Sequence, residues 1–132
     1  MQKVYFRTDA SIQIGSGHVM RCLTLANYLN ENGFKCEFIC REHKGNLIEY
    51  IKIKGFKVSI LPNTSKSSDR NLDYLSWLGE SQDNDAKQCI EILGDSMPSW
   101  LIVDHYGIDY NWEKAIKKTC VKLFCIDDLA DK

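Results

Sequence analysis

The residues best suited to chemistry lie together in the segment Ile14–Arg21, which reads Ile-Gly-Ser-Gly-His-Val-Met-Arg. Gly15 and Gly17 lack a β-carbon, so the backbone can approach a ligand closely there. The free amides at the start of the helix predicted to follow favour an anion. A dinucleotide fingerprint would need a third glycine where Met20 stands, and a Walker loop would need Gly-Lys-Ser/Thr; the segment has neither. It therefore predicts contact with a phosphate or a sugar without a standard nucleotide cradle.

His18 occupies the first turn of that predicted helix. The positive end of a helix dipole disfavours an imidazolium by about 0.3–1 kcal/mol when the ring is exposed. A nearby carboxylate such as Asp9 or Asp104 acts in the opposite direction. In either case we expect an uncharged ring near pH 7 that can accept a proton. The alternative is a histidine that only packs or caps the turn, and the adjacent glycines favour the chemical role.

Arg21 follows His18 by three residues, so both side chains share a face of the predicted helix. Arg21 either meets a phosphate or pairs with a surface carboxylate. His43 lies in a charged loop, and we expect it to be solvated. His105 follows the end of a predicted strand, and the sequence leaves open whether it orients another group or has no role.

Short β-prone runs alternate with helical patterns along the chain. The predicted strands are Lys3–Thr8, Lys35–Cys40, Lys57–Leu61, Trp100–Asp104 and Val121–Ile126. The predicted helices are His18–Asn32, Leu47–Ile53, Asp69–Leu78, Asp83–Leu93 and Trp112–Lys118, with a Ser-rich loop over Asn63–Arg70. Apolar strands that alternate with helices are typical of a parallel sheet covered on both faces. The sequence thus predicts the α/β class, as a Rossmann-like doubly wound sheet of about five strands in one domain over residues 1–132.

Polar residues follow three of these strands. The first strand is followed by Asp9, the fourth ends at Asp104 and continues into His105 and Tyr106, and the fifth is followed by Asp127 and Asp128. In an open α/β sheet, ligands bind outside the carboxyl ends of the strands, where the strand order reverses. We therefore expect a functional crevice at this edge of the sheet, with Asp9 and Asp104 among its lining residues.

Composition excludes several classes of protein. The 132 residues carry 17 Lys and Arg against 18 Asp and Glu, whereas a nucleic-acid binder would normally be basic. No apolar run approaches the ~20 residues of a membrane span, and the first residues do not resemble a secretory leader. The six cysteines include no C-x-x-C pair, so we expect reduced core thiols, no metal and a cytoplasmic protein. The acidic segment Asp69–Asp95 is expected to form a solvated face.

Three stretches of the chain, in the expected order, resemble the UDP-sugar hydrolases of pseudaminic acid biosynthesis. The first comprises Arg7-Thr8-Asp9-Ala10-Ser11 and the glycine turn that continues through Arg21 to Ala26. The second is Asp104-His105-Tyr106 with the following Asp109, Trp112 and Glu113, and the third is Ile126-Asp127-Asp128-Leu129-Ala130-Asp131. The resemblance covers essentially the whole chain.

The resemblance implies the N-terminal half of a two-domain GT-B fold, whose second, nucleotide-binding domain lies outside these residues. The family removes UDP from a 6-deoxy diacetamido-altrose nucleotide by inverting attack of water at the anomeric carbon, without a metal or other cofactor. Its catalytic histidine corresponds to His18, and its substrate-proximal tyrosine to Tyr106. We expect Gly15, Gly17 and Arg21, together with Asp9 and Asp104, to contact the substrate. The isolated chain is expected to be inactive.

Two other functions stay open. A glycosyltransferase of similar architecture would replace water by a sugar or lipid acceptor, with the Ser-rich loop Thr64–Ser68 near that acceptor. A non-catalytic module would bind a nucleotide sugar without turning it over. A phosphorylated receiver domain is disfavoured, because the acidic pair follows the last strand and no lysine follows at that strand's end.

Overall fold

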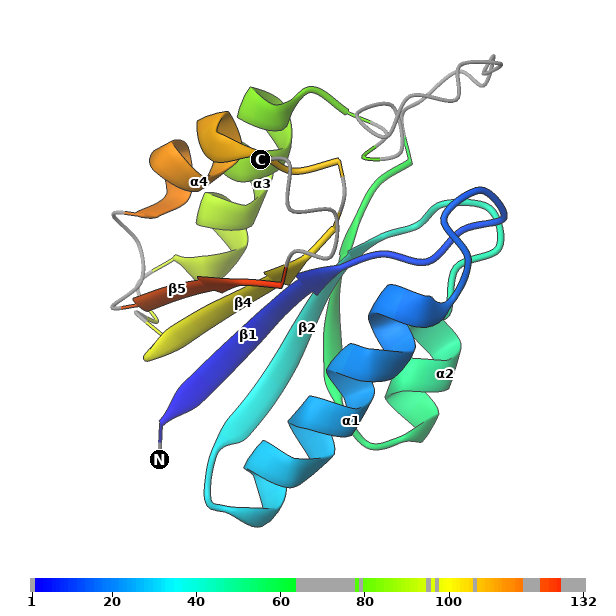
Figure 1. The fold of residues 1–132 in the computed structure, drawn as a ribbon, viewed down its shortest axis with the longest axis vertical. Helices are drawn as coiled ribbons and strands as arrows, with labels where there is room; N and C mark the ends of the chain where they lie inside the picture. The colour runs from blue at the N-terminus through cyan, green and yellow to red at the C-terminus, as the bar shows by residue number, and fades with distance from the viewer. Residues whose placement is uncertain are drawn as a thin grey trace.

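The computed structural model describes residues 2–63, 78, 80–94, 96, 98–105, 107–117 and 122–126. Within them, one parallel sheet has the strand order β3-β2-β1-β4-β5 (Figure 1). Its strands are β1 (Lys3–Thr8), β2 (Lys35–Arg41), β3 (Lys57–Leu61), β4 (Trp100–Asp104) and β5 (Lys122–Cys125). The described helices are α1 (Gly17–Glu31), α2 (Ile48–Ile53), α3 (Gln82–Leu93) and α4 (Tyr110–Ile116). The predicted Rossmann-like α/β fold class is confirmed.

Most predicted boundaries agree with the structure to within a residue. The main difference is α4, which begins at Tyr110 rather than at Trp112. Asp109 is the reason: its side chain accepts a hydrogen bond from the backbone N–H of Asn111 at 2.9 Å and so caps the helix earlier. The predicted helix Asp69–Leu78 and the Ser-rich loop lie almost wholly outside the described residues. No helix among the described residues is long and apolar enough to cross a bilayer.

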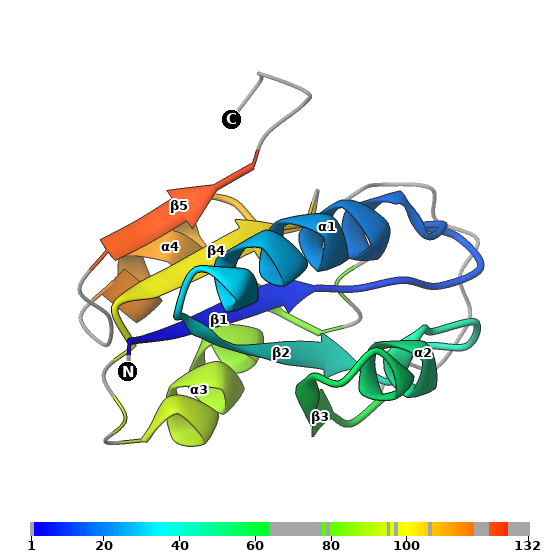
Figure 2. The same ribbon diagram turned by 90° about the horizontal axis from the view of Figure 1, so that it is seen from below.

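The helices cover the two faces of the sheet in pairs, with α1 and α2 on one face and α3 and α4 on the other (Figure 2). Alternate strand residues supply the two cores. Phe6 of β1 and Phe38 of β2 stack in the α1 layer, with ring centroids 4.9 Å apart. Tyr5 of β1 and Ile39 of β2 belong to the core of the α3 layer, which also contains Trp112 of α4. Each strand therefore directs successive side chains into different environments, which decides where its polar end residues point.

A buried ionic network joins the sheet to α3. Asp85 accepts hydrogen bonds from Arg7 of β1 and from Arg41 of β2, the shortest at 2.6 and 2.7 Å, and from the indole N–H of Trp112 at 2.8 Å. Burial alone would raise the pKa of Asp85, but the charge of Arg7 and the hydrogen bonds from Arg7 and Arg41 lower it well below its usual range. The expected solvated acidic face is thus wrong at this position, because Asp85 neutralises two arginines that are themselves fully buried.

We predict that Asp85→Asn lowers the free energy of unfolding by about 3–5 kcal/mol, because it leaves two buried guanidinium groups short of negative charge. Urea denaturation measures this loss. The exposed Asp83→Asn, in the same first turn of α3, serves as the control and should change stability little. Since the native carboxyl has a lowered pKa, the stabilisation is present above about pH 4 and is lost as the pH falls further. A small loss, equal to that of Asp83→Asn, would contradict the assignment.

Candidate active site

The centre of the candidate site is a histidine–aspartate pair between α1 and β4. His18 lies in the first turn of α1, and its Nδ1 is 2.6 Å from Oδ1 of Asp104, the last residue of β4. Since the carboxylate can only accept, Nδ1 carries a hydrogen, and the neutral form of the ring then has its lone pair at Nε2. The carboxylate is fully buried, whereas 7% of His18 is exposed. Such a pair orients an imidazole for proton transfer at Nε2.

Arg21 binds the same carboxylate. Its Nε is 2.5 Å from Asp104 Oδ2, and its second terminal nitrogen, Nη2, is 2.7 Å from Oδ1. The Sγ of Cys22 lies 3.8 Å from Oδ2, a weak contact. Burial would raise the pKa of Asp104, but the hydrogen bonds from Arg21 and His18 lower it. Arg21 therefore pairs with a carboxylate, as one of the two sequence-based alternatives held, although this carboxylate is buried rather than on the surface.

The glycine turn precedes this pair directly. Gly15 has φ +81°, and its N–H donates to the carbonyl of Ser11 at 2.8 Å, which closes a tight loop between β1 and α1. Ser16 stands at the helix N-cap without a side-chain capping hydrogen bond. A β-carbon placed on Gly15 or Gly17 would meet no atom within 4 Å. The turn thus leaves open space beside the amides at the start of α1, where an anionic group can approach.

The loop between β2 and α2 holds this turn in place from the side. The N–H of Ile12 donates to the carbonyl of Lys44 at 3.0 Å. The next residue, Gly45, has φ +86°, and a β-carbon there would lie 2.8 Å from both the backbone nitrogen and a side-chain carbon of Ile12. Only glycine permits this close approach of the two loops.

Gly45→Ala tests this contact against Gly33→Ala. Gly33 has a similar φ of +91° but open space around its missing β-carbon. Both variants pay about 1–2 kcal/mol for the left-handed backbone, and Gly45→Ala should cost a further ~1–3 kcal/mol because it pushes Ile12 away. Urea denaturation gives the energies, and amide chemical shifts of residues 11–17 should move only in Gly45→Ala. Equal losses of unfolding free energy in the two variants, without such shifts, would show that the contact between Gly45 and Ile12 does not hold the turn in place.

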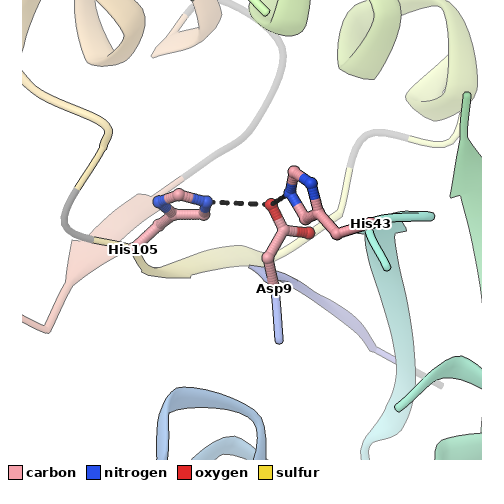
Figure 3. A group of neighbouring side chains, drawn as sticks. All are labelled: Asp9, His43 and His105. Carbon is pink, nitrogen blue, oxygen red and sulfur yellow. Dashed lines mark hydrogen bonds and ion pairs between the residues drawn. The ribbon is translucent and has the colours of Figure 1, made fainter. Parts of the chain in front are cut away.

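A second polar cluster surrounds Asp9, whose carboxylate lies between two imidazoles (Figure 3). Its Oδ2 is 2.8 Å from Nε2 of His105 and 3.2 Å from Nε2 of His43. Its Oδ1 accepts from the Arg7 guanidinium and from the backbone N–H of Arg41, both at 2.7 Å. Burial would raise the pKa of Asp9, but the charge of Arg7 and the two histidine contacts lower it well below its usual range. The expectation of a solvated His43 is wrong, since its loop folds against the β1–α1 turn.

These three side chains have the composition of a metal site, and the ligand atoms lie within 4.8 Å of one another. The hydrogen bonds argue against a cation. The N–H of Gly107 donates to Nδ1 of His105 at 2.9 Å, so that nitrogen holds the lone pair and Nε2 holds the hydrogen that Asp9 accepts. Metal binding through Nε2 would need the opposite tautomer. Arg7 already supplies the positive charge beside Asp9, so the donor set does not fit a metal ion.

The His105 ring makes stability depend on pH. Burial lowers the pKa of His105, and the neighbouring Asp9 only partly opposes this effect. Below about pH 6.5 the ring takes up a proton in the unfolded chain but resists it in the folded one, so acidification favours unfolding. We predict that His105→Asn, which keeps an acceptor for Gly107, shows a smaller loss of unfolding free energy between about pH 7.5 and pH 5.5 than the unchanged chain. Urea denaturation at both pH values measures it, and equal losses would contradict the prediction.

The pleat of the strands separates the two clusters. Thr8 of β1 is in register with Asp104 of β4, and the Thr8 hydroxyl donates to the Asp104 carbonyl at 3.1 Å. Phe6 and Ile102, two residues before them, face the α1 layer, so the side chain of Asp104 also lies on that face beside His18. Asp9 and His105 are one residue further along and lie on the face that carries Arg7. The expected single crevice is therefore two polar clusters, one on each face.

The predicted site residues thus fall into three groups. His18, Asp104 and Arg21 meet at the α1 face, directly after Gly15 and Gly17. Asp9 belongs to the cluster on the other face. Tyr106 lies outside the described residues, as do Asp127 and Asp128. The contacts of His43 and Asp85 had no signal in local sequence, because their charged partners, Asp9 for His43 and Arg7 and Arg41 for Asp85, are more than 30 residues away.

The chain is similar to two curated proteins, and no protein-family model matches it. A UDP-2,4-diacetamido-2,4,6-trideoxy-beta-L-altropyranose hydrolase of Campylobacter jejuni is 32% identical over 127 residues, which is 96% of this chain and 36% of the hydrolase. An uncharacterized protein of Methanocaldococcus jannaschii is 28% identical over 126 residues, 96% of this chain and 22% of that protein. The chain therefore spans about a third and a fifth of these relatives, and the similarity supports at most a domain like the matching part of the hydrolase.

Proposed function

We propose that this chain is the N-terminal, base-carrying domain of a nucleotide-sugar hydrolase. The proposed substrate is UDP-2,4-diacetamido-2,4,6-trideoxy-beta-L-altropyranose, as the name of the Campylobacter jejuni relative suggests. The similarity extends over nearly the whole chain and supports a nucleotide-sugar-related function. The observation that carries the proposal is the short contact of His18 with Asp104 beside an open glycine turn.

In the proposed reaction, Nε2 of His18 takes a proton from a water molecule as the water oxygen attacks the anomeric carbon. The bond from that carbon to the diphosphate oxygen breaks, and UDP departs with the electron pair. The free sugar gains a hydroxyl group from water. The Asp104 carboxylate stabilises the imidazolium through Nδ1, and the ring then returns its proton to solvent.

The remaining proposed contacts divide according to their geometry. The amides at the start of α1, after Gly15 and Gly17, are placed to donate to a phosphate or to sugar oxygens. Tyr106 keeps its proposed role as a hydrogen-bond partner of the sugar or of the water. Both oxygens of Asp104 and both of Asp9 already accept hydrogen bonds from protein groups. This favours a supporting role for the two carboxylates rather than direct contact with substrate.

We propose further that the rest of a longer protein completes the site. The hydrolase relative is nearly three times as long as its matched part. A second domain would bind the uridine and most of the diphosphate, as in two-domain enzymes whose cleft lies between their domains. On this proposal, the present chain alone binds UDP weakly and does not release it from the UDP-sugar.

The decisive variant is His18→Asn in the proposed two-domain protein. Asparagine can still donate to Asp104 from a position near Nδ1 but has no base at Nε2, so we predict a ~10²–10⁴-fold loss of UDP release with the fold retained. UDP release from the altrose nucleotide measures activity, and circular dichroism checks the fold. His43→Asn is the matched control on the opposite face and should retain most activity. Normal turnover in His18→Asn would refute the proposal.

Water labelled with oxygen-18 separates hydrolysis from glycosyl transfer. Label in the anomeric hydroxyl of the released sugar is the expected outcome for attack by water at carbon. A product joined to an added sugar or lipid acceptor, with no labelled free sugar, would instead identify a glycosyltransferase. Label in UDP would mean attack at phosphorus and would overturn the proposed mechanism.

A further inference from the structure

We infer that Thr8 is a positioning residue, whose hydroxyl fixes the end of β4 and so holds Asp104 where its carboxylate reaches His18. The inference deepens the proposed site, and its consequence for turnover rests on the proposed function. The sequence-based expectations placed Asp104 in contact with the substrate and assigned no role to Thr8.

Thr8 stands where two strands of the sheet part. It is the last residue of β1, and its partner in register, Asp104, is the last residue of β4. The strand order reverses between these neighbours, because β2 and β3 lie on one side of β1 while β4 and β5 lie on the other. In open α/β sheets, ligands bind in the crevice beyond the carboxyl ends of the strands at such a point. Thr8 therefore joins β1 to β4 at the edge where the candidate site begins.

The Thr8 side chain is fully buried and lies on the α1 face, two residues after Phe6. Its hydroxyl donates to the backbone carbonyl of Asp104 at 3.1 Å. Because threonine is branched at the β-carbon, rotation about χ1 is restricted and the hydroxyl keeps its direction. The side chain also contacts that of Cys22 on α1. One buried hydroxyl group thus touches both elements that carry the histidine–aspartate pair.

The carbonyl that Thr8 holds belongs to the peptide between Asp104 and His105. The orientation of this peptide decides where the two side chains point. Asp104 reaches His18 on the α1 face, whereas His105 reaches Asp9 on the other face. The contact between Asp104 Oδ1 and His18 Nδ1 is 2.6 Å long, so even a small movement of the strand end would lengthen it. Loss of the hydroxyl should therefore disturb the contact that orients the proposed base.

A purely structural role is the competing assignment, in which Thr8 only fills space in the core. That role predicts that turnover depends on stability alone. A positioning role predicts an effect on the Asp104 carboxylate that depends on the hydroxyl. Two substitutions separate these roles, because Thr8→Val keeps the shape without the hydroxyl and Thr8→Ser keeps the hydroxyl without the methyl group.

NMR of the 132-residue chain tests the contact without substrate. The unchanged chain should show a slowly exchanging hydroxyl proton for Thr8. In Thr8→Val the Nε–H resonance of Arg21 should shift, because this group donates to the Asp104 carboxylate at 2.5 Å and follows its movement. Thr8→Ser should restore most of the original position. Thr24→Val is the matched control, since it removes an exposed hydroxyl that donates to the Met20 carbonyl at 3.2 Å, and it should leave the Arg21 resonance unchanged.

Two results in this chain would overturn the inference. The first needs no variant: a Thr8 hydroxyl proton that exchanges as fast as that of the exposed Thr24. The second is an Arg21 resonance in a folded Thr8→Val chain that moves no further than in Thr24→Val.

Turnover is measured in the proposed two-domain protein. Thr8→Val should lower kcat for UDP release by ~10-fold or more with little change in KM, because it misplaces an orienting group without removing a contact to substrate. Thr8→Ser should recover most of this loss. Ile51→Val, a buried substitution in α2, is the stability control and should keep kcat nearly unchanged. A loss no larger than that of Ile51→Val, or one that serine does not recover, would assign Thr8 a purely structural role.

The inference and the proposed function fail separately, because the NMR results do not depend on turnover. Normal turnover in His18→Asn together with a displaced Arg21 resonance in Thr8→Val would refute the hydrolase mechanism and leave Thr8 as the residue that holds Asp104. An unmoved resonance together with an inactive His18→Asn would refute the role of Thr8 and leave the hydrolase proposal standing.

Discussion

A carboxylate taken out of water keeps its charge only where cations or hydrogen-bond donors replace the lost solvent, and three aspartates of this protein depend on that constraint. Asp9, Asp85 and Asp104 are all fully buried, and each has a lowered pKa although burial alone would raise it. Their compensating partners come from several strands and helices. The contacts of these three aspartates can therefore form only when those strands and helices are in their native positions. The geometry of the candidate site thus depends on the whole sheet.

The three aspartates serve different ends. Asp85 and Asp9 are linked through Arg7, which contacts both, and Arg41 adds a second tie to each through its side chain and its backbone N–H. This network fixes β1 and β2 against α3. Asp104 stands apart on the other face, where its partners are His18 and Arg21 of α1. On the face with the arginine network, Arg7, Arg41 and Asp85 are fully buried, whereas the face with His18 borders an open glycine turn.

The polar cluster around His18 is also the part of the chain that the similarity to known proteins concerns most directly. The chain is similar along nearly its full length to part of a UDP-sugar hydrolase, and it provides a histidine whose orientation is set by a buried carboxylate. The proposed base, His18, needs a reactant and a leaving-group site in front of it. The glycine turn, clamped through Ile12 and Gly45, offers amides on one side of that space. The proposed second domain would supply the groups that bind the nucleotide.

Local sequence patterns were sufficient for the elements and for the chemistry of one turn. Apolar runs between turn residues predicted the strands and helices. The spacing of apolar residues over a short stretch of sequence is enough to distinguish a buried strand from a helix with one buried face. The Gly-x-Gly-His-x-x-Arg spacing likewise marked His18 and Arg21 as a pair on one helix face. Tertiary structure alone decided their partner. Asp9 and Asp104 both follow parallel strands and looked equivalent in sequence, but the side-chain alternation of the strands sends them to opposite faces. His43 and Asp85 looked solvated because the arginine and aspartate that bury them lie far along the chain, and contacts of that kind exist only once the sheet has formed.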